Sequence, residues 1–125
     1  MNRGYVCIGL DHPKTPANVG SALRAVGVYG GAMLAISGKR YRKHNTDTMK
    51  HYRHLPLIQV DDLKSIIPYD CVPVAVDLVE VATPLPEYKH PERAFYIFGA
   101  EDATLGVLVL SRCRDIVYIP MKGCM

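Results

Sequence analysis

The sequence predicts an α/β protein, with a mostly parallel sheet covered by helices on both faces. Short apolar runs rich in β-branched residues alternate with segments that carry helix signals. Strands that alternate with helices generally pair in parallel. The 125 residues suit one domain, residues 1–125, and 49% of them are hydrophobic, which is enough for a sizeable core.

Six short apolar runs are the expected strands. They are Tyr5–Leu10, Ala32–Ser37, Leu57–Val60, Val72–Asp77, Ala94–Phe98 and Ile116–Ile119. Most of their residues are apolar, without a regular polar alternation, as expected for strands buried on both faces.

Three segments between these runs are expected to be helical. In the first, Asn18 is the expected N-cap and one face carries Val19, Leu23 and Val26. Its end and the following turn are expected at Gly27, Gly30 and Gly31. The second, Asp61–Ile67, has acidic residues in its first turn, and the third, Leu105–Arg112, ends on a basic residue, so both suit the helix dipole.

Composition and cysteine usage indicate a soluble, reduced, cytoplasmic protein. The four cysteines form no CxxC pair, and Cys7 and Cys71 lie in apolar runs typical of buried thiols. The N-terminal apolar run is too short for a secretory leader, and no run approaches the ~20 residues of a membrane span. The net charge of +3 permits an anionic partner without requiring one.

The common nucleotide-binding fingerprints are missing from the sequence. No GxGxxG follows the first expected strand, and no GxxxxGK[ST] occurs. A small flavodoxin-like nucleotide protein fits the order of elements but would have no phosphate-binding signature. Ligands of such sheets bind beyond the carboxyl ends of the strands, so the residues that follow each strand are the candidates for a site.

Three motifs follow expected strands and carry the functional signal. They are NVGSALR (residues 18–24), FGAED (residues 98–102) and IPMKG (residues 119–123). Each is weak alone. Together, in this order and spacing, they resemble the SpoU-type, TrmH-like branch of the SPOUT RNA methyltransferases, and the resemblance covers essentially the whole chain.

The resemblance implies an S-adenosylmethionine-dependent RNA methyltransferase that methylates a ribose 2′-hydroxyl of tRNA or rRNA. It also implies a homodimer and a trefoil knot, in which the C-terminal segment threads through a loop. Small single-domain members often act on tRNA, which places tRNA slightly ahead of rRNA.

The resemblance also assigns roles to individual residues. Asn18 and Arg24 match the first-motif residues that lie near the target nucleotide and the dimer interface. The residues implied to line the cofactor pocket are Leu78, Gly99, Glu101, Ile119 and Met121.

Two departures from the family pattern leave an alternative open. The second motif usually continues as FGxExxGL, whereas here FGAEDATLG displaces the glycine to Gly106. The sequence given stops at Met125, where the family continues through a turn and a final helix that closes the knot. The alternative is a catalytically inactive RNA-binding relative of the same fold.

Arg24 is expected to position a phosphate beside the target ribose. A guanidinium grips phosphate through two parallel hydrogen bonds, and Gly20, one turn earlier on the same helix face, leaves room for a ligand. Arginine side chains stay protonated in proteins, which disfavours Arg24 as the base, so the identity of the base stays open. The alternative for Arg24 is a surface or interface salt bridge.

The long polar segment Gly38–His54 is the candidate RNA contact. Its cations include Lys39, Arg40, Arg42 and Lys43, and it also carries Tyr41 and Tyr52. Basic side chains bind phosphates and aromatic rings stack on unpaired bases, although a solvated loop is the alternative. Its histidines lack a completing set of cysteines or carboxylates, so no metal site is predicted.

Overall fold

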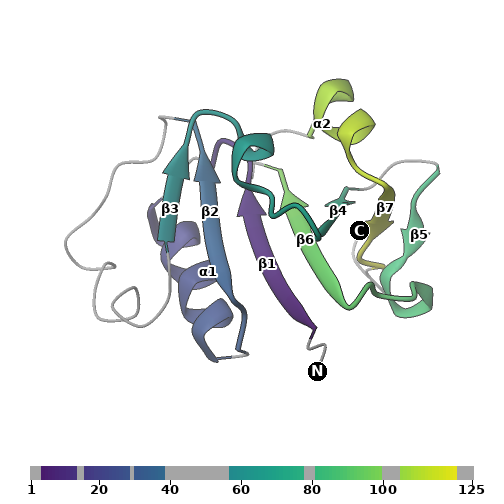
Figure 1. Ribbon diagram of the computed structural model, residues 1–125, viewed down its shortest axis with the longest axis horizontal. Helices are drawn as coiled ribbons and strands as arrows, with labels where there is room; N and C mark the ends of the chain where they lie inside the picture. Colours follow the sequence, from purple (N-terminus) through teal and green to yellow (C-terminus); the bar gives the residue numbers. More distant parts are fainter. Residues whose placement is uncertain are drawn as a thin grey trace.

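A parallel sheet forms the centre of the protein (Figure 1). The computed structural model describes residues 4–13, 16–28, 30–38, 57–77, 81–99 and 105–120. Within these ranges the sheet has seven strands in the order β3-β2-β1-β6-β4-β7-β5, and all neighbouring strands are parallel. The strands are β1 (Tyr5–Leu10), β2 (Met33–Ser37), β3 (Leu57–Val60), β4 (Val72–Val76), β5 (Thr83–Pro84), β6 (Arg93–Phe98) and β7 (Asp115–Tyr118).

The six expected strands are confirmed. β1 and β3 have the expected bounds, and the others shift by one residue at one or both ends. β5 was not predicted, because a run of two residues shows no periodicity. Pro84 suits the edge position of β5, since a proline there removes no hydrogen bond from the sheet interior.

The first helix, α1 (Pro16–Val28), starts earlier than expected. Proline suits the first helical position, because the N–H it lacks would have no partner inside the helix. Asn18 is therefore the third residue of α1, and its predicted role as N-cap is wrong.

Gly30 ends α1. Its φ of 77° is left-handed, and the N–H of Gly31 donates to the carbonyl of Val26 over 2.8 Å, which is the hydrogen bond of a Schellman motif. Gly27, expected at the helix end, lies inside α1.

The other expected helices are shorter than predicted. Residues 63–66 form a 3-10 helix, η2 (Leu63–Ile66), because Pro68 favours an extended Ile67, whose ψ is 122°. Helix α2 (Val107–Arg112) begins after Gly106, whose φ of 87° breaks the helical conformation. A further 3-10 turn, η3 (Leu85–Glu87), follows β5.

Apolar residues are buried on both faces of the sheet, and α1 lies across one of these faces (Figure 1). On one face α1 buries Val19, Leu23 and Val26 near Leu34 and Ile36 of β2. On the other face the buried residues include Cys7, Ala35, Leu63, Cys71, Phe95 and Leu105. The predicted burial of both thiols is confirmed, and burial raises the pKa of Cys7 to about 11.

Candidate functional site

Because the strands are parallel, their carboxyl ends all lie on the same side of the sheet. This side, which runs across the strand ends, is called the carboxyl edge below. β6, β4 and β7 are neighbours there, so Gly99, Asp77 and Ile119 follow adjacent strands. Gly99 is half-buried and Ile119 is 50% exposed. The fold thus brings together the ends of the three strands from which a cofactor pocket is predicted. The assigned roles of Gly99 and Ile119 stay predictions, and Leu78, Glu101 and Met121 lie outside the described residues.

Asp77 joins two parts of this edge. Its N–H donates to the carbonyl of Val117 over 2.9 Å, and its Oδ2 accepts from the N–H of Leu105 over 3.2 Å. The carboxylate therefore ties the end of β4 to the residues that follow the second motif. Sequence reasoning treated Asp77 only as the end of a strand. The signal that could have identified Asp77 was a carboxylate at the end of an apolar run that predicts a buried parallel strand.

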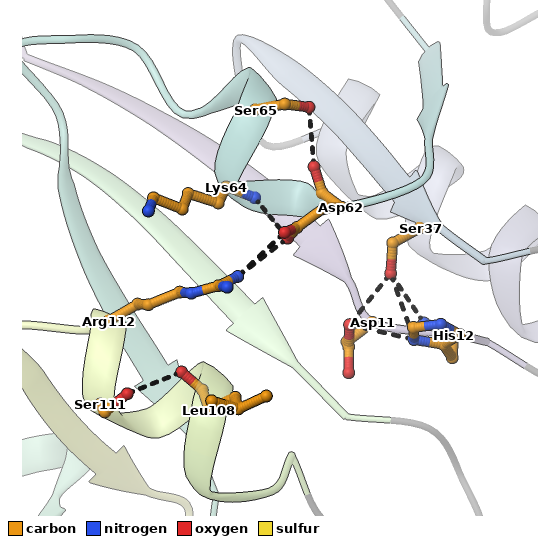
Figure 2. Close-up of polar contacts among 9 residues, drawn as sticks. All are labelled: Asp11, His12, Ser37, Asp62, Lys64, Ser65, Leu108, Ser111 and Arg112. Carbon is orange, nitrogen blue, oxygen red and sulfur yellow. Dashed lines mark hydrogen bonds and ion pairs between the residues drawn. The ribbon is translucent and has the colours of Figure 1, made fainter.

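A second polar cluster joins the ends of β1 and β2 (Figure 2). The Ser37 hydroxyl donates to Asp11 Oδ1 over 3.0 Å and accepts the N–H of His12 over 3.1 Å. The His12 Nδ1 lies 3.2 Å from the same Oδ1. Sequence reasoning missed this cluster, because a serine inside the run AMLAIS resembles any strand residue.

An ion pair ties α2 to η2 at the same edge (Figure 2). The Arg112 Nη1 lies 3.1 Å and 3.0 Å from the two carboxylate oxygens of Asp62. Asp62 also accepts the N–H of Lys64, and this hydrogen bond, with the Arg112 interaction, holds the pKa of Asp62 below its usual value. The pair anchors the helix that follows the second motif.

Arg24 lies exposed on α1, while the buried face of that helix packs on the sheet. It makes no ion pair with any residue that the structure describes. Asn18 lies in the first turn of α1, but its side chain is outside the described part. The predicted RNA contacts Lys39, Arg40, Arg42 and Lys43 also lie outside it.

One groove lies at the opposite end of the strands, near their amino ends. It has a volume of about 460 Å³ and is lined mostly by glycine and aliphatic residues, among them Gly4, Val6, Val26 and Gly31. This lining offers little hydrogen-bonding chemistry. The candidate site is therefore placed at the carboxyl edge, where β6, β4 and β7 end side by side, and not at this groove.

The described ranges hold neither a membrane-spanning helix nor a group of metal ligands. None of the helices there has the length and apolar character needed to cross a membrane. In the same ranges no three His, Cys, Asp or Glu side chains are grouped so as to hold a metal ion.

The model of the SpoU rRNA Methylase family matches residues 5–125. The chain belongs to this family. It is 26% identical, over 98% of its length, to the 23S rRNA (guanosine-2′-O-)-methyltransferase RlmB of Acinetobacter baylyi, and the match covers 53% of RlmB. The chain thus spans about half the length of this curated relative.

Solved structures share the fold. The SpoU methyltransferase AviRb from Streptomyces viridochromogenes, in complex with AdoMet, superposes with a TM-score of 0.83 at 20% identity, over 98% of this chain and 51% of AviRb. A structure concerned with 2-OH methylation of C/U34 on tRNA superposes with a TM-score of 0.81 at 21% identity, over 98% of this chain and 84% of that one. The predicted SPOUT-type α/β fold is confirmed.

Proposed function

We propose that this protein is an S-adenosylmethionine-dependent RNA methyltransferase that transfers a methyl group to a ribose 2′-hydroxyl of tRNA or rRNA. The observation that carries the proposal is the sheet order, in which β6, β4 and β7 end side by side in a chain of the SpoU family. RlmB, a 2′-O-methyltransferase, and the AdoMet complex of AviRb support the reaction and the cofactor.

The described residues at this edge fit such a cofactor. Gly99 has no side chain to obstruct the end of β6, and Ile119 and Pro120, which follow β7, are exposed. Leu78, Glu101 and Met121 complete the proposed pocket. S-adenosylmethionine supplies a sulfonium-bound methyl group, which an oxygen nucleophile can take up without a metal.

The chain's own contribution is to hold the ribose in line with that methyl group. Positioning of this kind can supply ~7–11 kcal/mol of a barrier. Arg24, exposed on α1, is proposed to grip the phosphate beside the target ribose, with Asn18 near the nucleotide. The identity of the base is not assigned.

The first experiment is calorimetric titration of S-adenosylmethionine into residues 1–125 and into the complete product of the gene. Methyl transfer to RNA is then followed with a labelled cofactor, and 2′-O-methylation is mapped on the product. Binding and transfer by either chain would support the proposal. RNA binding by both chains without cofactor binding would identify an inactive RNA-binding relative instead.

We propose tRNA as the preferred substrate. Small single-domain members of the family often act on tRNA. One structural relative is described for 2-OH methylation of C/U34 on tRNA, whereas RlmB is named for 23S rRNA. Equal amounts of bulk tRNA and ribosomal RNA, offered in one reaction, test the preference. Labelling confined to the ribosomal RNA would refute it.

We further propose a cytoplasmic homodimer. The free thiols of Cys7, Cys71 and Cys113 suit a reducing compartment, and the dimer follows from the family resemblance. Sedimentation equilibrium of the gene product tests the dimer, and a single monomeric species at micromolar concentration would refute it.

A further inference from the structure

Ser37 is a buried hydroxyl in an apolar strand. Its residue is only 1% exposed, and it is the one fully buried polar side chain among the described residues. Leu34, Ala35 and Ile36, which precede it in β2, are buried as well. A buried hydroxyl without partners is costly, so its hydrogen bonds must account for its presence.

The hydrogen bonds of Ser37, together with one from the main chain of Asp11, connect three strand ends. The Ser37 hydroxyl bonds the carboxylate of Asp11 and the main chain of His12, which links β2 to β1. The N–H of Asp11 in turn donates to the carbonyl of Phe98 over 2.8 Å, which links β1 to β6. We call the Ser37, Asp11 and His12 cluster the Ser37 clasp (Figure 2).

The turn held by the clasp is not one that the local sequence favours. His12 has a φ of 53°, a left-handed conformation that costs roughly 1–2 kcal/mol in a residue with a Cβ. Its ring lies against Gly38, where an added Cβ would come within 2.4 Å of the His12 Cδ2. Such strain persists only where the surroundings enforce it, and it is concentrated at functional sites.

We propose that Ser37 is a positioning residue for methyl transfer, acting through Asp11. The clasp fixes the turn that leads into α1, and with it Arg24, relative to the end of β6 and Gly99. It thereby fixes the position of Arg24, on the substrate side of the site, relative to Gly99, on the cofactor side. This inference rests on the proposed function, in which these two sides must be aligned for in-line attack.

The first test is Ser37→Ala in the complete gene product. A misplacement of about 1 Å can reduce a rate by about 10²-fold, so kcat should fall at least tenfold while the affinity for S-adenosylmethionine stays within about twofold. Ser37→Thr keeps the hydroxyl and should restore most of kcat. The matched control is Ser65→Ala, since the exposed Ser65 hydroxyl donates to the Asp62 carbonyl on η2; it should leave kcat unchanged.

The partner is tested by a double-mutant cycle. Asp11→Ala should reproduce the loss of kcat, whereas Asp11→Asn retains an acceptor oxygen and should lose less. Because both side chains act through one hydrogen bond, Ser37→Ala combined with Asp11→Ala should be little worse than either alone. Fully additive losses would overturn the coupling.

Amide hydrogen exchange measures the clasp independently of activity. Ser37→Ala should speed exchange at residues 11–12 while the melting temperature falls only by a few degrees. Faster exchange with wild-type kcat would overturn the positioning role, and unchanged exchange would overturn the clasp itself. If the wild-type protein transfers no methyl group, the proposed function fails, and the positioning role fails with it.

Discussion

Arg24 is the single residue that we expect to matter most for methyl transfer. Arg24→Ala should abolish methyl transfer yet leave cofactor affinity intact, because an exposed guanidinium on α1 is proposed to contact RNA and not the cofactor. Arg24→Lys should recover only part of the rate, since an ammonium cannot make the two parallel hydrogen bonds. Transfer assays and calorimetry on the same preparations measure both quantities.

A second exposed arginine provides the control for this experiment. Arg114 lies just before β7 and pairs with Asp115 over 3.1 Å, at the end of the strand away from the carboxyl edge. Arg114→Ala should leave transfer unchanged. Full activity of Arg24→Ala would eliminate the positioning role of Arg24.

Two glycines with left-handed backbones separate strain from steric overlap. Gly30→Ala should lower the free energy of unfolding by about 1–2 kcal/mol, because φ is 77° and no atom beyond the two chain neighbours lies within 4 Å of the new Cβ. Gly38→Ala should lower it further, because the new methyl group also meets His12 at 2.4 Å. Urea unfolding of both variants measures the difference, and equal losses would show that the His12 ring yields freely.

The sequence predicts site residues from their position directly after an expected strand. This works where the end of a strand can be recognised from the neighbouring residues alone. It placed Gly99 and Ile119 at strand ends, which the structure confirms as positions. It missed Ser37, because the partner of Ser37 is Asp11, and strand pairing brings them together across the sheet.

At the scale of elements, the Asp62–Arg112 pair should give stability a specific pH dependence. The folded-state pKa of Asp62 lies below its unfolded value, so its contribution is present above about pH 4 and is lost as pH falls through the folded pKa. The contribution should be small, because both side chains are partly exposed.

Unfolding by urea between pH 6 and pH 3 measures this contribution. Asp62→Asn should be less stable than the wild type at pH 6, and the two should converge in acid. Asp61→Asn, which changes the neighbouring exposed carboxylate, is the control. A gap between wild type and Asp62→Asn that persists at pH 3 would contradict the linkage.

The elements themselves were predictable where a periodic signal was long enough. The buried face of α1 follows directly from Val19, Leu23 and Val26. The reduction of residues 61–67 to a 3-10 turn was harder to foresee, because the acidic residues suit a helix start but Pro68 stops the helix from growing. Asp62 caps η2, although the sequence had indicated only acidic residues in the first turn, and that turn contains none.

For the whole molecule, the basic segment predicts the salt dependence of RNA affinity. Arg40→Glu combined with Arg42→Glu should weaken RNA binding and reduce the slope of log K against log[salt] by about 1 per lost phosphate contact. The control is Lys89→Glu, which reverses an exposed charge that follows η3. Titration at several salt concentrations decides, and an unchanged slope would remove this segment from the RNA interface.

The architecture was predictable as a class but not as an order of strands. Alternating strand and helix signals imply a parallel sheet, and this is observed. Nothing in the individual runs specifies that β4 inserts between β6 and β7, because that choice depends on contacts between distant segments. The family resemblance, and not periodicity, is what predicts a common site for the three motifs.

The pairing of β1 with β6 has a consequence for how the chain reaches its native state. Tyr5 pairs with Arg93 and Leu10 with Phe98, so an early strand completes its hydrogen bonds only with a late one. During synthesis the side of β1 that pairs with β6 stays without hydrogen-bond partners until β6 has left the ribosome. Non-local parallel pairing of this kind slows folding and prolongs the exposure of apolar strand edges. Nascent chains that end before β6 should therefore depend on chaperones for solubility.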